Sequence, residues 1–158
     1  MHFHDGTIDG IIWKPLRKFN DGRGWLCELF RHDETPAEFH PVMAYISLTE
    51  MGVARGPHEH EDQADYFCFI GPSNFKIYLW DNRKQSATFG NREVRIAGLD
   101  EPMALIVPAG VVHAYKNVGQ EPGLVFNCPN RLYKGHGRKD PVDEIRHEES
   151  TGSVYKLD

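Results

Sequence analysis

The chain has 158 residues, a length that fits one domain with a self-sufficient hydrophobic core. Hydrophobic residues make up 40% of the sequence and charged residues 26%, the usual mix of a soluble globular protein. The formal net charge is -5 with no basic run, which argues against nucleic-acid binding through phosphate neutralisation. No apolar stretch approaches the ~20 residues of a membrane-spanning helix, and the first residues do not resemble a signal peptide. We therefore expect a single cytoplasmic domain over residues 1–158.

The cysteines do not indicate a disulfide framework. Cys27, Cys68 and Cys128 are odd in number and lack the Cys-x-x-Cys spacing of metal or redox sites. Cys68 and Cys128 also lie in apolar runs, where buried and reduced thiols are the expectation.

Most of the elements predicted along the chain are short β-strands. β-branched and aromatic residues alternate there with turns rich in Gly, Pro and Asn. In chain order the expected strands cover residues 42–48, 66–70, 75–79, 94–96, 104–107 and 124–127. Strands this short and evenly spaced are typical of an antiparallel sandwich or barrel and not of βαβ units.

Two short helices are expected beside the strands. Residues 33–38 favour a single turn near the N-terminal third. Residues 140–144 carry a stronger signal, because Asp140 suits the N-cap, Pro141 the first helical position, and acidic residues follow in the first turn.

Histidines at two places in the chain are the strongest candidates for a functional site. On a strand, His58 and His60 point to the same face because side chains alternate, and such a pair is half of a metal site or a base with a neighbour. His113 follows a Pro-x-Gly turn and lies near the start of another expected strand. The other six histidines are expected at the surface without a role.

These two segments together resemble the motifs of the cupin superfamily. The motif Gly-x5-His-x-His-x4-acid matches at Gly52, His58, His60 and Asp65, with Asp where most cupins have Glu. The motif Pro-x-Gly-x-x-His-x3-Asn matches from Pro108 through His113 to Asn117. The resemblance implies an all-β fold, a jelly-roll barrel, with the three histidines facing its interior.

Further segments resemble one cupin branch, the dTDP-4-dehydrorhamnose 3,5-epimerase family. The similar segments follow the family's order from about residue 14 to about residue 145, and they are residues 21–28, 55–58, 86–90 and 106–113. The resemblance implies an isomerase that acts on a nucleotide-linked 4-keto-6-deoxy sugar in deoxysugar and polysaccharide biosynthesis. It also implies a homodimer formed through β-strands, and no cofactor.

The resemblance also implies roles for single residues. His58 matches the catalytic base, which removes a proton next to the keto group, and an imidazole with its pKa near neutrality suits that role. Arg23 and Arg55 match positions that hold the substrate, and a guanidinium suits a diphosphate. Glu28 is expected to help place the nucleotide, and His113 to contact substrate.

Three positions depart from the family pattern. The lysine that stabilises the enolate falls on Asp65, whose charge would repel a developing oxyanion. The acid tyrosine falls on Phe126, which has no proton to give, and we expect Tyr133 to replace it. The aspartate that orients the base has only a weak positional match at Asp158.

These departures leave two other hypotheses open. A divalent metal of unknown identity, held by His58, His60, Asp65 and His113, would restore the lost positive charge, with Tyr115 or Tyr133 moving the proton. Such a chain would be a metal-dependent cupin, of the sugar-phosphate isomerase or dioxygenase type. The third hypothesis is a cupin that binds a sugar without catalysis. The nucleobase and the epimerised carbon stay open.

Overall fold

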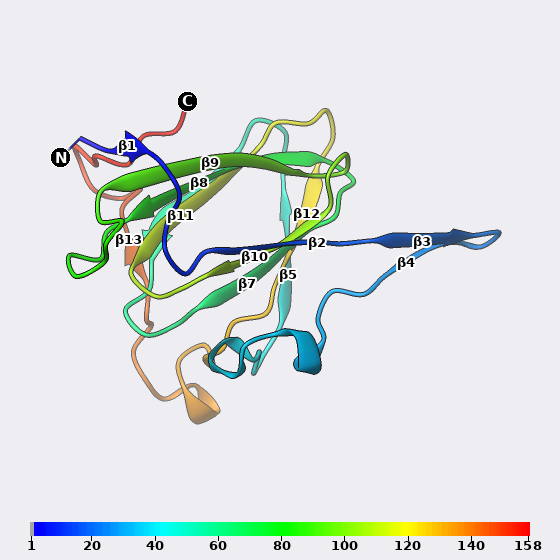
Figure 1. Cartoon of the computed structure of the whole chain (residues 1–158), viewed down its shortest axis with the longest axis horizontal. Helices are drawn as coiled ribbons and strands as arrows, with labels where there is room; N and C mark the ends of the chain where they lie inside the picture. The colour runs from blue at the N-terminus through cyan, green and yellow to red at the C-terminus, as the bar shows by residue number, and fades with distance from the viewer. Residues whose placement is uncertain (1) are drawn as a thin grey trace.

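The computed structural model describes residues 2–158, which form two β-sheets packed face to face and one separate hairpin (Figure 1). In spatial order, the six-stranded sheet contains β1 (His4–Asp5), β9 (Asn91–Gly98), β8 (Asn74–Asp81), β11 (Val111–Asn117), β6 (Ala54–Glu59) and β13 (Ile145–Arg146). The five-stranded sheet contains β2 (Ile12–Pro15), β10 (Met103–Val107), β7 (Asp65–Phe69), β12 (Gly123–Asn127) and β5 (Tyr45–Thr49). All neighbours in these sheets are antiparallel except β1 and β9.

Alternation along the strands separates the inner core from the outer faces. On β7, Phe67 and Phe69 point between the sheets and pack with Phe75, Leu79 and other apolar side chains. On the same strand, Tyr66 and Cys68 point to the outer face, as the two-residue period of a strand requires. The inner cluster fills one end of the sandwich and leaves the other end to polar side chains.

The outer faces of both sheets are covered by segments from elsewhere in the chain. Residues 27–39 cross the outer face of the five-stranded sheet, where Leu29 and Phe30 pack around Tyr66 and Cys68. The N- and C-terminal segments lie together over the six-stranded sheet, where Phe3 and Tyr155 contact each other. Cys68 is buried and all three cysteines are free thiols, as expected, whereas Cys128, which was also expected to be buried, is only half-buried.

The hairpin of β3 (Lys18–Asp21) and β4 (Gly24–Cys27) extends away from the two sheets (Figure 1). It exposes three large apolar side chains, those of Phe19, Trp25 and Leu26. Exposed strand edges with apolar residues are surfaces on which a second chain can add.

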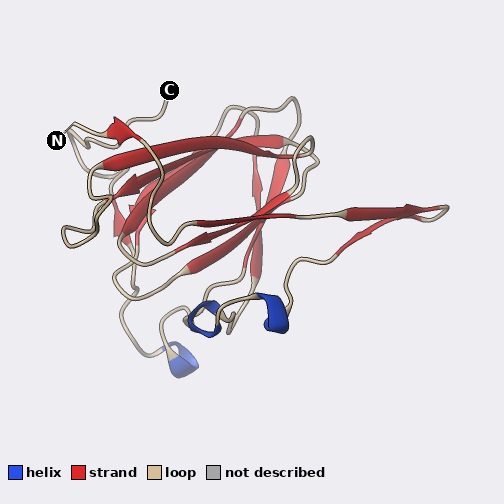
Figure 2. Cartoon of the chain, in the orientation of Figure 1, coloured by secondary structure: helices blue, strands red, loops and turns tan. Residues whose placement is uncertain are grey.

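Among residues 2–158 the helical content is limited to three single 3-10 turns, η1 (His32–Glu34), η2 (Ala37–Phe39) and η3 (His136–Arg138), which gather at one end of the sandwich (Figure 2). The first two fall where one turn was expected. The helix expected at residues 140–144 is wrong, because these residues form an irregular segment that leads into β13 beside β6. There the Asp143 side chain accepts three backbone N–H groups of residues 61–63 and does not cap a helix.

The six expected strands are present with ends shifted by up to three residues. The strands missed by the sequence analysis are β1, β2, β13 and the hairpin, most of which are short or lie at sheet edges. Within residues 2–158, every helix is too short to cross a membrane.

Candidate active site

A cavity of about 1290 Å³ opens at the polar end of the sandwich. Its walls come from β5 and β6 and from the segment of residues 129–148, which runs past the cavity mouth and ends along β6 as β13. A volume on the order of 1,000 Å³ is at the upper end of what small-molecule sites have. Strands from both sheets and a long connecting segment therefore share one cavity.

Three imidazoles meet at the bottom of this cavity. His58 and His60 line it from β6 and the residue that follows β6, and His113 lies behind them on β11, almost fully buried. The ring centroids of His58 and His113 are 4.5 Å apart, and each of these rings is 5.9 Å from His60. Gly56 makes this approach possible, because a Cβ there would lie 2.6 Å from the carbonyl oxygen of His113.

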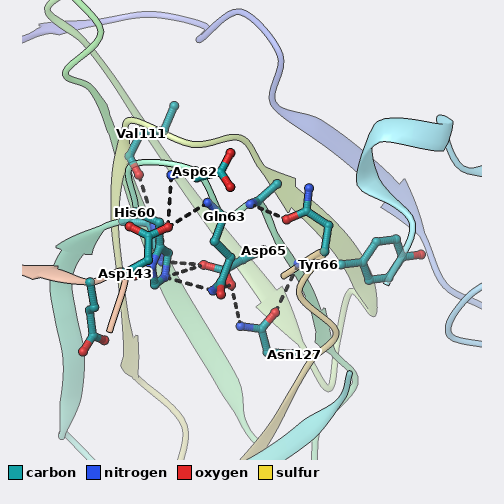
Figure 3. A network of polar contacts seen from close by, with 12 residues as sticks. His60, Asp62, Gln63, Asp65, Tyr66, Val111, Asn127 and Asp143 are labelled. Carbon is teal, nitrogen blue, oxygen red and sulfur yellow. Dashed lines mark hydrogen bonds and ion pairs between the residues drawn. The ribbon is translucent and has the colours of Figure 1, made fainter. Parts of the chain in front are cut away.

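Asp65 contacts two of the imidazoles, those of His60 and His113, and Figure 3 shows it beside His60. Its Oδ2 is 3.3 Å from Nε2 of His60 and 3.2 Å from Nε2 of His113. Its Oδ1 accepts hydrogen bonds from the side-chain amides of Gln63, at 2.9 Å, and Asn127, at 2.8 Å. The carboxylate is buried, so its charge is compensated by these neighbours and not by water.

The segment that ends in β13 holds His60 in place. The backbone carbonyl of Asp143 accepts a hydrogen bond from Nδ1 of His60, and the Asp143 carboxylate accepts from the N–H groups of Glu61, Asp62 and Gln63 (Figure 3). Nδ1 of His60 is engaged by the Asp143 carbonyl, and the ring held in this orientation turns its other nitrogen, Nε2, toward Asp65.

The pKa values of His58 and His60 are shifted in opposite directions. Burial and the neighbouring His113 lower the pKa of His58 to about 2, so this imidazole is neutral. Burial also disfavours the charged form of His60, but the hydrogen bond and charge of Asp65 outweigh it and raise the pKa of His60 to about 9. Burial opposes the ionised form of Asp65 as well, and the contacts with His113 and His60 nevertheless hold its pKa below its usual range.

The same geometry suits a metal ion. Nδ1 of His113 lies 3.1 Å from the carbonyl of Val111, which can only accept, so the neutral ring presents a lone pair at Nε2. This buried Nε2 has no hydrogen-bond partner within residues 2–158 and faces an acceptor, Oδ2 of Asp65. Two acceptors in contact repel unless a proton or a cation lies between them. His58, His60 and His113 each offer a nitrogen within 4.8 Å of the others, so the donor set fits a divalent cation.

The other residues predicted for the site are divided between the cavity and the surface. Arg55 and Tyr133 line the cavity. Arg23 is at the tip of the hairpin and pairs with Asp21, and Glu28 follows the same hairpin; neither lies in the cavity lining of its own chain. Asp158 does not orient His58, because it pairs with Lys76 on the outer face of the six-stranded sheet.

Phe126 does not occupy the position expected of an acid. It points to the outer face of the five-stranded sheet, whereas its neighbour Asn127 points inward to Asp65. The register pairs Asn127 with Tyr45 on β5, and the Tyr45 hydroxyl accepts a hydrogen bond of 2.9 Å from the Asn127 amide. The sequence analysis missed Tyr45 and Asn127, because no motif marks them and only strand pairing brings them to the histidines; it gave Gln63, two residues before Asp65, no role.

Comparison with known proteins identifies relatives over most of the chain. The sequence profile of the dTDP-4-dehydrorhamnose 3,5-epimerase family matches residues 5–143. The chain is 39% identical over 139 residues to the "Spore coat polysaccharide biosynthesis protein SpsL" of Bacillus subtilis, and the aligned region covers 88% of each protein. It is 37% identical over 140 residues to the "Probable low-salt glycan biosynthesis epimerase Agl13" of Haloferax volcanii, and the aligned region covers 87% of this chain and 86% of that relative.

Solved structures share the fold. A dTDP sugar isomerase from Desulfovibrio desulfuricans superposes with a TM-score of 0.76 at 21% identity, over 88% of this chain and 84% of that one. The 3'-monoepimerase ChmJ from Streptomyces bikiniensis, solved with dTDP-quinovose, superposes with a TM-score of 0.73 at 24% identity, over 92% of this chain and 72% of that one. These matches confirm the expected all-β jelly-roll fold of the cupin type.

Proposed function

The chain belongs to the dTDP-4-dehydrorhamnose 3,5-epimerase family of sugar epimerases, and on this premise we propose that it inverts a carbon next to the keto group of a nucleotide-linked 4-keto-6-deoxy sugar. The pathway in this proposal is the synthesis of a surface polysaccharide or a related glycan, as the names of the two curated relatives suggest. The reaction is an isomerisation in which the same carbon loses a proton on one face and gains one on the other.

The observation that carries the proposal is the environment of His58. The His58 ring lines the cavity, and burial beside His113 keeps its imidazole neutral, so a ring nitrogen can accept a proton. Its lowered pKa also makes it a weak base, so removal of the proton next to the keto group requires strong stabilisation of the enolate oxygen. His58 removes the proton in the proposed reaction.

The sequence places a carboxylate, Asp65, at the position of the family's lysine, where its charge would repel the enolate oxygen, but the structure keeps Asp65 out of the cavity. The carboxylate is buried beneath His60 and His113 and does not line the cavity. The ring of His60 does line the cavity, and its raised pKa of about 9 makes it an imidazolium at neutral pH. In the proposed reaction, this positive charge takes the place of the family's lysine next to the enolate oxygen.

Cationic side chains in the cavity wall support a nucleotide diphosphate as part of the substrate. Arg131 pairs with Asp62, and Arg146 with Glu144, so their charges are already compensated. Three other cations of the wall have no carboxylate partner within residues 2–158, and they are Arg55, Lys134 and Arg138. ChmJ, which shares the fold and was solved once with dTDP and once with dTDP-quinovose, binds ligands of this class.

The hairpin supports a homodimer as the working form. Arg23 lies far out on an exposed apolar hairpin, and it can hold a substrate only in the cavity of a second copy. The edge strand β5 exposes Ile46 and Leu48 on its outer face and offers a surface for such a hairpin. We place Arg23 and Glu28 at the partner's cavity.

The three free thiols support a reducing compartment, the cytoplasm.

A solvent-exchange experiment tests the epimerase proposal. Purified protein is incubated in D2O with a panel of 4-keto nucleotide sugars, and deuterium at the carbons next to the keto group is followed by NMR, with and without EDTA. The proposal predicts exchange and a new epimer, both unaffected by EDTA, since the reaction as proposed needs no cofactor. Binding of a nucleotide sugar without any exchange would identify a sugar-binding protein without catalysis.

A metal-dependent reaction is the second candidate, because His113 presents an unpartnered buried Nε2 to Asp65. His58, His60, Asp65 and His113 would hold the ion, which as a Lewis acid polarises a carbonyl or a phosphoryl oxygen. The activity would then be of the sugar-phosphate isomerase or dioxygenase type, and Tyr115 or Tyr133 would move the proton, because a ligating His58 is no longer a free base. Stoichiometric metal in the purified protein, with loss of activity after chelation, would favour this candidate over the epimerase.

A further inference from the structure

Inversion at one carbon needs an acid on the face opposite to the base. His58 approaches the cavity from β6 in the six-stranded sheet. Tyr45 approaches the same cavity from β5 in the five-stranded sheet, and the two sheets face each other across the sandwich. A sugar ring held between the sheets therefore has the imidazole on one side and the Tyr45 phenol on the other.

The hydrogen bonds around Asn127 fix which way the Tyr45 hydroxyl points. The backbone N–H of Tyr66 can only donate, and it lies 3.1 Å from Oδ1 of Asn127, so this atom is the amide oxygen. The two hydrogens of Nδ2 then go to Asp65 Oδ1, at 2.8 Å, and to the Tyr45 hydroxyl oxygen, at 2.9 Å. The Tyr45 hydroxyl is therefore an acceptor in this bond, and its own proton has no acceptor within residues 2–158.

The other tyrosines of the cavity are arranged differently. The Tyr115 hydroxyl, buried at the back, shares a hydrogen bond of 3.2 Å with Ser47. Tyr133, on the segment at the cavity mouth, is half exposed like Tyr45, but within residues 2–158 no hydrogen bond orients its hydroxyl, whereas Asn127 holds that of Tyr45. Burial and the charge of Asp65 raise the pKa of Tyr45 to about 12, so its hydroxyl carries a proton throughout the neutral range. Tyr45 thus combines a fixed oxygen with an uncommitted proton.

We propose that Tyr45 is the catalytic acid of this epimerase, in the role expected from sequence of Tyr133. The inference rests on the proposed function. His58 takes the proton from the carbon next to the keto group and becomes an imidazolium, and the C–H electron pair forms the enolate. The Tyr45 O–H bond then breaks as its proton forms a new C–H bond on the opposite face. The phenolate takes a proton from water and the imidazolium returns one to water, so the sugar is isomerised without net proton transfer.

The test compares two readouts in D2O, namely deuterium exchange at the substrate carbon and formation of the epimer. Tyr45→Phe removes one oxygen and leaves the base in place, so we expect exchange with retained configuration and at least a 100-fold lower rate of epimer formation. Tyr155→Phe is the matched control, because Tyr155 lies on the outer face of the six-stranded sheet, away from the cavity. Thermal unfolding and dTDP binding of both variants, measured beside wild type, establish that the fold and the cavity are intact.

The outcomes separate the inference from the proposed function. Exchange without inversion in Tyr45→Phe, with both retained in Tyr155→Phe, supports Tyr45 as the acid. Epimer formation by Tyr45→Phe within threefold of wild type overturns the assignment and leaves the epimerase proposal standing, and Tyr133→Phe then identifies the predicted alternative. Loss of exchange together with inversion in a folded Tyr45→Phe also overturns it, because an acid on the second face does not act in the first step. Wild-type protein that exchanges no 4-keto nucleotide sugar removes the proposed function and the inference with it.

Discussion

His58 and His113 are direct cross-strand partners on β6 and β11, and their ring centroids lie 4.5 Å apart. Two imidazolium ions at this separation and this depth repel strongly, so the pair does not carry two charges. Burial and the neighbouring His113 lower the pKa of His58 to about 2, so the His58 imidazole is neutral. The sheet register thus places a neutral imidazole at the cavity wall, where we propose that it acts as the base.

His58→Asn should abolish exchange of solvent deuterium into the substrate. The amide cannot take up a proton, and a general base contributes about 10²- to 10⁴-fold to a rate. His4→Asn is the matched control, because His4 is exposed on β1 at the far side of the six-stranded sheet. NMR of the substrate in D2O measures both variants. Exchange by His58→Asn at the rate of the control would exclude His58 as the base.

Asp65 should contribute more to folding than an ordinary surface carboxylate. Removing one partner from a buried charged network costs about 3–5 kcal/mol, so Asp65→Ala should lower the free energy of unfolding by that amount. Asp65→Asn should cost much less, because its oxygen still accepts from Gln63 and Asn127 and its amide can donate to an imidazole Nε2. Urea unfolding compares the two. Equal losses in both variants would contradict the hydrogen-bond pattern assigned here.

The stability of the chelator-treated protein should fall as the pH rises from 6.5 to 9. The pKa of His60 is raised from its ordinary value of 6.5 to about 9 in the folded state, so between these values the folded protein holds a proton that the unfolded chain has released. This stabilisation is complete below pH 6.5 and is lost as the pH passes through 9. Urea unfolding at several pH values should show the slope, and His60→Gln should lack it. A slope of the same size in the variant would assign it to another group.

Lys134 and Arg138 should affect substrate binding and leave the chemical step unchanged. Both line the cavity mouth without a carboxylate partner within residues 2–158, so an alanine at either position should raise the KM for a nucleotide sugar about tenfold, a loss near 1.4 kcal/mol, at unchanged kcat. The effect should shrink at high salt. Lys84→Ala, an exposed cation outside the cavity, serves as the control. A lower kcat with unchanged KM would place these residues in the reaction and not in binding.

The hairpin should mediate dimer formation. A chain with Trp25→Glu and Leu26→Glu places a charge on each exposed face of β4 and should be monomeric by light scattering. Ile96→Glu, at an equally exposed apolar residue on β9, should leave the dimer intact. If Arg23 acts in the partner's cavity, Arg23→Ala should weaken nucleotide-sugar binding and keep the dimer. Wild-type protein that is monomeric at assay concentrations and fully active would rule out the shared site.

The sequence alone determined those features that follow from local spacing. Alternation along a strand was enough to put His58 and His60 on one face, and the turn before His113 was enough to start its strand. Short strands separated by turn residues were enough to indicate an all-β barrel. Family motifs identified the epimerase relationship and led us to predict His58 as the base, because these residues stand at characteristic spacings.

Only the tertiary structure decided which polar groups meet those histidines. Tyr45 and Asn127 are 82 positions apart and face each other only because β5 pairs with β12, and the same register turns Phe126 away from the cavity. Asp143 lies in an irregular segment before β13, where its carboxylate accepts from a backbone N–H group 80 positions earlier, and this long-range contact overrode its local helix signal. Local propensity acts over a few neighbouring residues, whereas the partners of a buried donor or acceptor are set by long-range strand pairing.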